Sequence, residues 1–267
     1  MKYPSDLWGS RDGRPLIMGI LNVTPDSFSD GGAHFSKKDA LEHAYRLIDE
    51  GADIVDVGGE STRPGSDPVS EEEELKRVIG VIKELAPTVG VPISIDTAKP
   101  RVADGSVKAG ASMVNDIWGL RNEAMADVVI SRGVPAVIMH MHGTPKTLAA
   151  DTMEGDALAE IKRFLDERAE HMVSRGMDKR NIILDPGVGF GKTAEQNMAI
   201  VSDSGRFGGD HTVLIGPSRK RFLSQYYPDT DKDDATAIVS KIAADSGAGI
   251  LRVHDVRKVR SYLGQSR

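Results

Sequence analysis

Short apolar runs alternate along this chain with longer amphipathic stretches. The runs are rich in Val, Ile and Leu and lack polar/apolar alternation, which is typical of parallel strands buried on both faces. The expected strands are Leu16–Ile20, Asp53–Val57, Pro92–Ile95, Ser112–Val114, Ala136–Met139, Asn181–Leu184, Thr212–Ile215 and Gly249–Val253. The pattern therefore predicts eight buried strands.

The stretches between these runs have helical periodicity, and Ser70 is a suitable N-cap for the second of them. The expected helices are Lys37–Glu50, Glu71–Ala86, Arg101–Lys108, Glu123–Arg132, Gly155–Arg175, Ala194–Ser204, Arg219–Gln225 with Ala235–Ser246, and Asp255–Leu263. Eight alternating β–α units predict a (β/α)8 TIM barrel, with residues 1–267 as one domain. The alternative, a doubly wound open sheet, often has a glycine-rich first turn, whereas Leu-Asn-Val-Thr-Pro-Asp follows Ile20 here.

Composition narrows the function classes. A formal net charge of -6 argues against a nucleic-acid binder, although a local basic site remains possible on an acidic protein. The absence of cysteine excludes disulfides, thiolate catalysis and cysteine-ligated metals. Residues 1–14 lack an apolar signal region, and no window approaches the roughly 18 apolar residues of a membrane span. We therefore expect a cytoplasmic protein with no membrane or nucleic-acid partner.

Every expected strand is followed by a polar or charged group. These groups are Asn22, the segment Gly58–Gly65, Asp96, Asn115-Asp116, His140–Gly143, Asp185–Gly187, Ser218–Lys220 and Arg252–Asp255. A single Asp or Asn before a helix is more often an N-cap than a catalytic group. In a TIM barrel, however, the active site lies at the carboxyl ends of the strands, so a complete ring of such groups favours a functional site there.

The ring combines two kinds of chemistry. Carboxylate and amide groups suit a heterocycle with N–H donors and acceptors, and the sequence supplies Asp96, Asn115 and Asp185. Cations suit a phosphate-like anion, and the sequence supplies Arg63, Lys220, Arg252 and His254. A helix expected to start at Ser218 would add free N–H groups. The ring therefore predicts an enzyme that acts on a polar heterocycle carrying a phosphate-like group.

Two other motifs lead to no metal or nucleotide site. His140 and His142 flank Met141 where a strand should end, and no third ligand is near them in sequence, so a zinc site is not expected. The glycine-rich segment Asp185–Lys192 lacks the spacing of a Walker P-loop.

From about Leu16 to Leu263 the sequence resembles the dihydropteroate synthase family. The resemblance rests on Ile17–Gly32, Asp53–Gly65, Asp96-Thr97, Asn115-Asp116, Asp185–Lys192, Ser218–Lys220 and Arg252–Val256. It implies a TIM-barrel transferase of folate biosynthesis that uses Mg2+, forms a homodimer and is a sulfonamide target. The implied reaction joins 6-hydroxymethyl-7,8-dihydropterin pyrophosphate to 4-aminobenzoate and releases 7,8-dihydropteroate and pyrophosphate.

The resemblance also implies roles for individual residues. The pterin would be held by Asp96, Asn115, Met139, Asp185 and Lys220. The pyrophosphate would be bound by Asn22, Arg252 and His254, with Asn22 also contacting Mg2+. The aminobenzoate pocket would include Thr62, Arg63, Pro64, Phe190, Ser218 and Arg221. The catalytic groups would be Asp96, Lys220, Arg252 and His254, in a dissociative displacement during which the loops after the first two strands close over the site.

Three positions depart from the family pattern: Arg221 replaces a common Ser, His142 a frequent Gln, and Ala235-Thr236 a common Gly-Ser/Thr pair. The resemblance places Arg221 at the aminobenzoate end of the site, so this departure affects the assignment of the acceptor substrate. Two alternatives stay open at this stage. One is a pterin-binding methyltransferase domain, which shares the Asp/Asn pterin contacts; the other is a catalytically silent paralogue that binds pterin.

Overall fold

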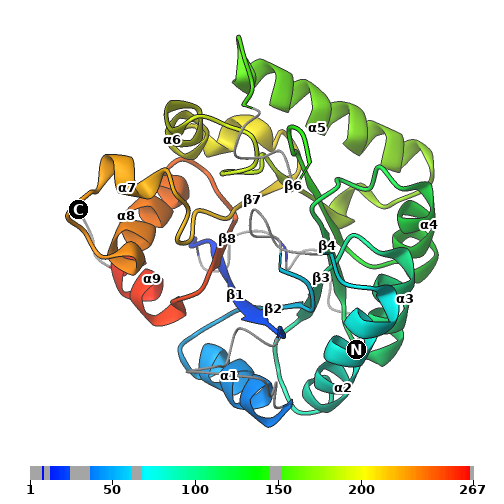
Figure 1. Ribbon diagram of the computed structural model, residues 1–267. Coiled ribbons are helices and arrows are strands. Elements are labelled where there is room, and N and C mark those ends of the chain that lie inside the picture. Colours follow the sequence, from blue (N-terminus) through cyan, green and yellow to red (C-terminus); the bar gives the residue numbers. More distant parts are fainter. Residues whose placement is uncertain (1–7, 9–12, 25–36, 62–67, 145–151, 265–267) are drawn as a thin grey trace.

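A computed structural model describes residues 8, 13–24, 37–61, 68–144 and 152–264. Its strands form a closed parallel barrel in which each pairs with the next in sequence and β8 pairs with β1 (Figure 1). The strands are β1 (Leu16–Asn22), β2 (Ile54–Gly58), β3 (Ile93–Asp96), β4 (Met113–Asp116), β5 (Ala136–Met139), β6 (Ile182–Asp185), β7 (Thr212–Ile215) and β8 (Ile250–Val253). The predicted (β/α)8 barrel is confirmed, and all eight predicted strands are present.

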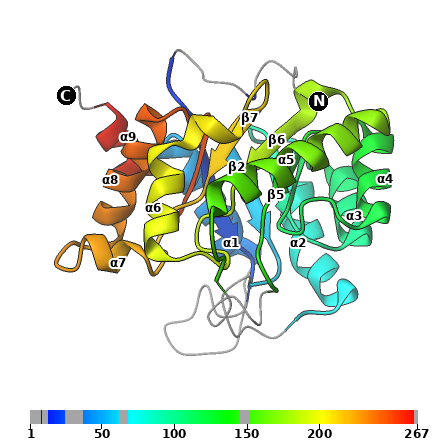
Figure 2. The same ribbon diagram turned by 90° about the horizontal axis from the view of Figure 1, so that it is seen from above.

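Helices surround the barrel, and Figure 2 shows them standing on both sides of the strands. They are α1 (Lys37–Asp49), α2 (Glu71–Leu85), α3 (Pro100–Ala109), α4 (Glu123–Arg132), α5 (Ala157–Ser174), α6 (Ala194–Ser202), α7 (Leu223–Tyr226), α8 (Lys232–Asp245) and α9 (Val256–Leu263), with the 3-10 helices η3 (Lys179–Asn181) and η4 (Ser204–Phe207). Ser70 caps α2 as predicted, because its side chain accepts the N–H of Glu73 at 3.2 Å.

One helix prediction is wrong at its start. The segment after β7 was expected to be helical from Arg219, but α7 begins only at Leu223 and residues 218–222 form turns. Two backbone N–H groups of this segment have partners: that of Arg219 bonds the Thr236 hydroxyl at 3.0 Å, and that of Lys220 bonds the Pro217 carbonyl at 3.3 Å. No helix therefore starts at Ser218, and the expected row of free N–H groups at a helix start is not formed there.

Side chains alternate between the two faces of the barrel wall. The outward side chains pack beneath the helices in one large apolar core that includes Ile17, Val55 and Val57. The inward side chains at the amino end form a second cluster, composed of Trp8, Leu16, Met18, Ile54, Met113, Val137, Ile183, Leu214 and Ile250. The amino end of the barrel interior is thus filled with apolar atoms, and only the carboxyl end is left for polar groups.

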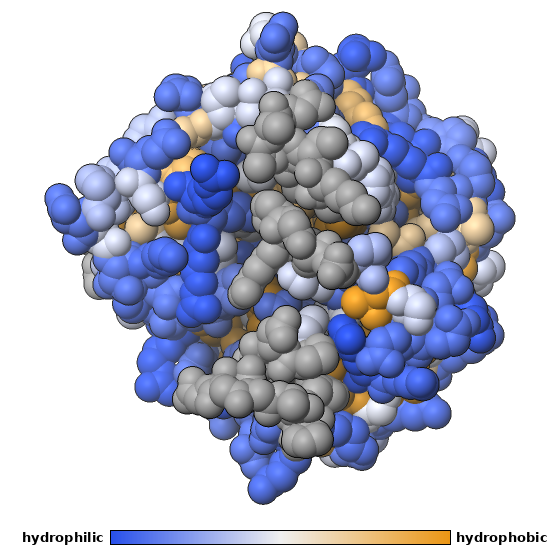
Figure 3. All heavy atoms as spheres, viewed as in Figure 1, coloured by the Kyte–Doolittle hydropathy of each residue, from blue (hydrophilic) through white to orange (hydrophobic). Residues whose placement is uncertain are grey.

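Figure 3 shows the carboxyl-end face, which is largely hydrophilic with small, separate hydrophobic areas. In the part of the chain that the structure describes, no helix is long and apolar enough to cross a membrane.

Candidate active site

Strand register brings the predicted polar groups into one ring. Asn22 lies opposite Gly58, Gly58 opposite Asp96, and Asp96 opposite Asn115 on successive strands. On the other side of the barrel, Met139 lies opposite Asp185. Asp96, Asn115 and Asp185 of this ring are buried.

Arg252 is held between two carboxylates inside this ring. Its Nε donates to Oδ2 of Asp56 at 2.6 Å, and its Nη2 donates to Oδ2 of Asp96 at 2.6 Å. Burial alone would lower the pKa of Arg252, but the charges of Asp56 and Asp96 outweigh burial and raise it above its ordinary value. Arg252 is therefore a permanent cation with a fixed orientation, and its other N–H groups remain available to an anion.

Asp56 is a functional residue that the sequence analysis missed. It is fully buried in the middle of β2, and its Oδ2 also accepts the Nδ2 of Asn115 at 3.0 Å. Because a carboxylate only accepts hydrogen bonds, this contact fixes which end of the Asn115 amide faces the barrel opening. The sequence did contain a signal for Asp56, because it is a single carboxylate within an otherwise apolar run. Such a charge is buried only where hydrogen-bonding or oppositely charged groups surround it.

The carboxyl of Asp96 is shifted toward its protonated form. Burial raises its pKa, and the nearby charges of Asp56, Glu74 and Asp116 raise it further, while Arg252 opposes the shift. Asp116, its neighbour on β4, is different: its carboxylate accepts the backbone N–H groups of Trp118 and Leu120, both at 2.9 Å. Asp116 therefore stabilises the loop after β4, and only Asn115 of that pair joins the site.

Asp185 and Lys220 form the opposite side of the site. Oδ1 of Asp185 accepts the Gly187 N–H at 2.7 Å, and burial raises the pKa of this carboxyl while Lys220 opposes the shift. The ammonium of Lys220 donates to the Val188 carbonyl and lies 4.5 Å from the centroid of the Phe190 ring. Burial lowers the pKa of Lys220 to about 8, against the attraction of Asp185.

An apolar wall lies beside these charges. Ile117, Met139 and Met141 are buried together, with Ala98, Trp118 and Phe190 packed against them. Met139 and Phe190 were predicted site residues. The remaining members of the wall could not be chosen from the sequence, because apolar residues after strands usually belong to the core. A wall of thioether and aromatic groups suits the face of a flat ring.

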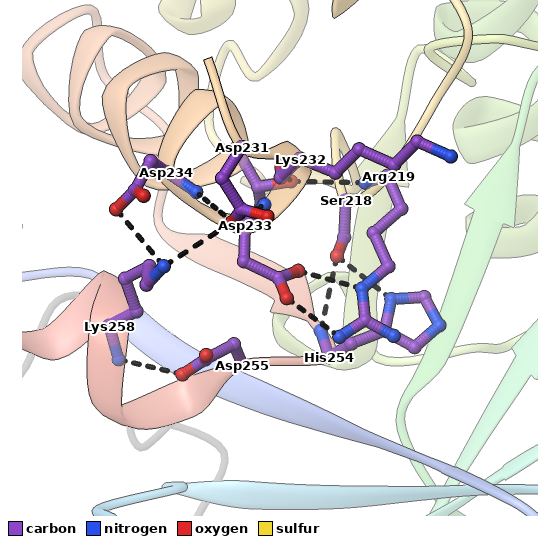
Figure 4. Close-up of polar contacts among 10 residues, drawn as sticks. Ser218, Arg219, Asp231, Lys232, Asp233, Asp234, His254, Asp255 and Lys258 are labelled. Carbon is purple, nitrogen blue, oxygen red and sulfur yellow. Dashed lines mark hydrogen bonds and ion pairs between the residues drawn. The ribbon is translucent and has the colours of Figure 1, made fainter.

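Ser218 and His254 are in direct contact at the end of β8 (Figure 4). The Ser218 hydroxyl accepts the backbone N–H of His254 at 3.2 Å and lies 2.8 Å from Nδ1 of the same residue. Next to them, Arg219 has a positive φ of 57° and is fixed by a bidentate ion pair to Asp233 at 2.7 and 2.9 Å. Ser218 thus lies beside His254, while Arg221 is exposed on the following turn.

Part of the predicted acceptor pocket, namely Thr62, Arg63 and Pro64, lies outside the described residues, as do residues 25–36 of the first loop. The two described ends of the second loop are tied together, because Glu60 accepts the Val69 N–H at 3.0 Å. Lys99 donates to Glu60 and, at 2.5 Å, to the buried Glu74.

No group of three or more His, Cys, Asp or Glu residues that could hold a metal ion occurs in the described ranges. Asn22 nevertheless provides a hard oxygen at the rim: its Oδ1 and the Oδ2 of Asp96 lie 3.9 and 3.8 Å from the point where Gly58 would carry a Cβ. One amide oxygen, completed by substrate oxygens and water, suits Mg2+. His140 is turned to Lys192, with 3.1 Å between its Nδ1 and the lysine Nζ.

Comparison with known proteins assigns the family. The model of the pterin binding enzyme family matches residues 18–254. The chain is 45% identical to the dihydropteroate synthase of Bacillus subtilis over 92% of its own length and 85% of the relative. It is 43% identical to that of Escherichia coli strain K12, over 91% and 88%. The solved dihydropteroate synthase of Xanthomonas albilineans superimposes with a TM-score of 0.87 at 43% identity, covering 94% of this chain and 91% of that one. The chain therefore belongs to the pterin binding enzyme family and, within it, to the dihydropteroate synthases, transferases of folate synthesis.

Proposed function

We propose that this transferase joins 6-hydroxymethyl-7,8-dihydropterin pyrophosphate to 4-aminobenzoate. The observation that carries the proposal is the arrangement of Arg252, fixed between Asp56 and Asp96, across the barrel opening from Asp185 and Lys220. A heterocycle bound to Asp185 and Lys220 would direct a negatively charged substituent toward Arg252. Relatives support the substrates: the X. albilineans enzyme is solved with 4-aminobenzoic acid and with 7,8-dihydropteroate.

The pterin ring is assigned to Asn115, Met139, Asp185 and Lys220. The free oxygen of the Asp185 carboxylate accepts N–H groups from the aminopyrimidinone edge, an arrangement strengthened by charge. The Lys220 ammonium donates to the ring carbonyl. Met139 packs on the ring face with the apolar wall described above.

The pyrophosphate is assigned to Arg252, His254 and Asn22. Arg252 approaches it with a fixed fork, because two of its N–H groups are already bonded to carboxylates. When bound, Mg2+ would be held by Asn22 and would offset negative charge on the leaving group. The contact between the Ser218 hydroxyl and Nδ1 fixes the orientation of the His254 ring, which we assign to the same anion.

The reaction is a displacement at the pterin CH2 carbon. The C–O bond breaks first, and the electron pair leaves with pyrophosphate, so positive charge spreads into the pterin ring. The amine nitrogen of 4-aminobenzoate then bonds to this carbon and loses a proton. Asp96, in the ionised form that its contact with Arg252 favours, stabilises the positive charge beside the ring, and Arg252 stabilises the departing anion. No covalent bond to the enzyme is required.

The acceptor is assigned to Phe190 and the loop residues Thr62, Arg63 and Pro64, with Ser218 and Arg221 near its carboxylate. A sulfonamide would compete for this pocket; the Yersinia pestis relative is solved with a sulfonamide drug complex. We further assign a dimeric, cytoplasmic enzyme, as expected from the family resemblance.

The decisive experiment is a turnover assay that follows pyrophosphate release with both substrates. Release that depends on added 4-aminobenzoate supports the proposal. A silent pterin-binding protein would bind the pterin and release nothing, and a methyltransferase domain would bind pterin without consuming its pyrophosphate ester. Either result contradicts the proposed reaction.

A further inference from the structure

The loop between β6 and α6, residues 186–193, forms one wall of the site and packs closely on its surroundings. A Cβ on Gly187, whose φ is +70°, would lie 1.9 Å from the His140 carbonyl oxygen. A Cβ on Gly189, whose φ is +82°, would lie 2.6 Å from Cδ of Lys220. The loop therefore contacts the end of β5 behind it and Lys220 in front of it, with no room for a side chain at either glycine.

The loop contains a buried lysine, Lys192, that the proposed mechanism does not use. Lys192 is only 7% exposed. Its ammonium lies 3.0 Å from the Phe190 carbonyl oxygen, 3.4 Å from the His140 carbonyl oxygen and 3.1 Å from Nδ1 of His140. Three N–H donors thus face three acceptors. Two of those acceptors belong to the end of β5 and one belongs to the loop, so the ammonium connects the two segments.

Burying this ammonium is unfavourable for folding. No described carboxylate forms an ion pair with Lys192, and burial lowers its pKa to about 7, with Lys220 adding to the effect and Asp185 opposing it. His140 also remains neutral, since burial lowers its pKa to about 3. Neutral His140 with an accepting Nδ1 carries its proton on Nε2. An apolar side chain would avoid the cost of burial, which points to a role in the site beyond filling space.

We propose that Lys192 is a positioning residue for the transferase reaction, fastening the 186–193 loop to the end of β5 so that Phe190 is correctly placed. The Phe190 carbonyl is bonded to Lys192 while the Phe190 ring lies 4.5 Å from the Lys220 ammonium. The same loop supplies the Val188 carbonyl that Lys220 bonds. At the opposite end of the loop from Lys192, the Gly187 N–H holds Asp185. Loss of the Lys192 contact should therefore affect the acceptor more than the pterin; this expectation rests on the proposed substrates.

His140 offers a matched pair of variants. His140→Asn keeps an acceptor near the position of Nδ1, whereas His140→Leu removes it, and both variants lose the edge contact of the imidazole with Phe164. We expect His140→Leu to raise the KM for 4-aminobenzoate about tenfold, with the pterin KM within about threefold of wild type. His140→Asn should stay within about threefold for both substrates.

The lysine itself can be tested because the chain has no cysteine. Lys192→Cys can be alkylated in denaturant with bromoethylamine, which restores an ammonium of nearly the original length, or with a propyl reagent, which restores length without charge. After refolding, the aminoethylated protein should recover the aminobenzoate KM to within about threefold, while the propylated protein and Lys192→Met should show the tenfold increase.

Equal kinetics for His140→Leu and His140→Asn, or for the two alkylated proteins, would overturn the proposal. If the lysine variants do not fold, the His140 pair decides. Wild-type protein that releases no pyrophosphate with 4-aminobenzoate would contradict the proposed function; an active wild type with no selective change in the variants would contradict this inference alone.

Discussion

The two halves of the barrel interior are built from the same strands and differ in chemistry. At the amino end the inward side chains of β2, β4, β6 and β8 are Ile54, Met113, Ile183 and Ile250. Two residues further along the same strands they are Asp56, Asn115, Asp185 and Arg252. Because side chains on one face of a strand recur every second residue, both sets face the barrel axis. The comparison separates a half that stabilises the fold from a half that binds.

The charged half depends on the apolar half. Burying Asp56, Asp96 and Asp185 costs free energy that the hydrogen bonds and the Arg252 ion pairs offset only in part. The apolar half, filled by Trp8 and its neighbours, provides favourable burial, and the strand side chains in it carry no polar groups that need hydrogen-bond partners. Substitutions in the two halves should therefore have different effects, and the following predictions start from the largest.

Arg252→Ala should have the largest effect, because it damages both stability and binding. It leaves the carboxylates of Asp56 and Asp96 without their cation, and breaking a buried ion pair in this way costs about 3–5 kcal/mol. We expect urea unfolding to show that loss. Calorimetry should show that the pyrophosphorylated pterin loses far more affinity than hydroxymethyl pterin.

The double variant Arg252→Met/Asp56→Asn is the control for this prediction. It removes one of the two stranded charges, so it should regain part of the stability while affinity for the pyrophosphate stays low. Equal loss of affinity for both pterins would place Arg252 away from the leaving group.

Trp8→Ala should reduce the stability of the fold and leave substrate binding unchanged. Trp8 is 2% exposed among the apolar side chains at the amino end of the barrel, so truncation should cost about 3–5 kcal/mol in urea unfolding. Its indole N–H has no hydrogen-bond partner among the residues that the structure describes, so Trp8→Phe should cost much less. Substrate KM values of the folded Trp8→Ala protein should be unchanged; a large shift in them would show that the two halves are not separate.

The sequence predicted the strands and most of the ring for a simple reason. Buried parallel strands are continuous apolar runs, and the first polar residue after each run marks the carboxyl end where barrel sites form. Asp96, Asn115 and Asp185 were found this way. Asp56 was missed because it lies within β2, two residues before the end of the strand, and the prediction considered only residues that follow a strand.

The sequence did not show which way individual side chains point. A shift of one residue exchanges the two faces of a strand, so Asn115 and Asp116 look equivalent until the register is known. Ser218 and Arg219 looked like a helix start, but contacts with His254, Thr236 and Asp233, distant in sequence, keep this segment in turns. The role proposed for Lys192 likewise depends on contacts with the end of β5 that no local pattern indicates.

Asp185→Asn tests the binding half without removing a cation. The change keeps the shape of the side chain but replaces an acceptor oxygen with an amide donor that faces donors on the pterin. The loss should be about 2–3 kcal/mol, or roughly 30- to 150-fold in the Kd of the dihydropterin. Calorimetry measures this directly. Near-normal affinity would remove Asp185 from the pterin site.

The pH dependence of stability should reveal Lys192. Burial lowers its pKa to about 7 in the folded chain from 10.5, so between these values the unfolded chain binds more protons and stability rises with pH. Relative to Lys192→Met, wild-type stability should therefore rise by about 1.5 kcal/mol between about pH 7 and 8.5. Urea unfolding of both proteins at several pH values gives the difference. A constant difference would mean that Lys192 keeps its ordinary pKa in the folded state.

Arg221→Ala should have the smallest effect, at the outer edge of the binding half. Arg221 is exposed on the turn after Lys220, where the family resemblance places the carboxylate of the acceptor. The backbone N–H groups of Arg219 and Lys220 are already bonded, to the Thr236 hydroxyl and the Pro217 carbonyl, so the Arg221 side chain is a further donor on this turn. An exposed charge pair contributes about 1 kcal/mol, so the aminobenzoate KM should rise about fivefold while the pterin KM is unchanged. Sulfonamide inhibition should weaken in parallel, and Arg221→Lys should keep part of the effect because it retains the charge but not the planar fork. An unchanged aminobenzoate KM would mean that Arg221 only covers neighbouring surface with its stem, and that other groups bind the carboxylate.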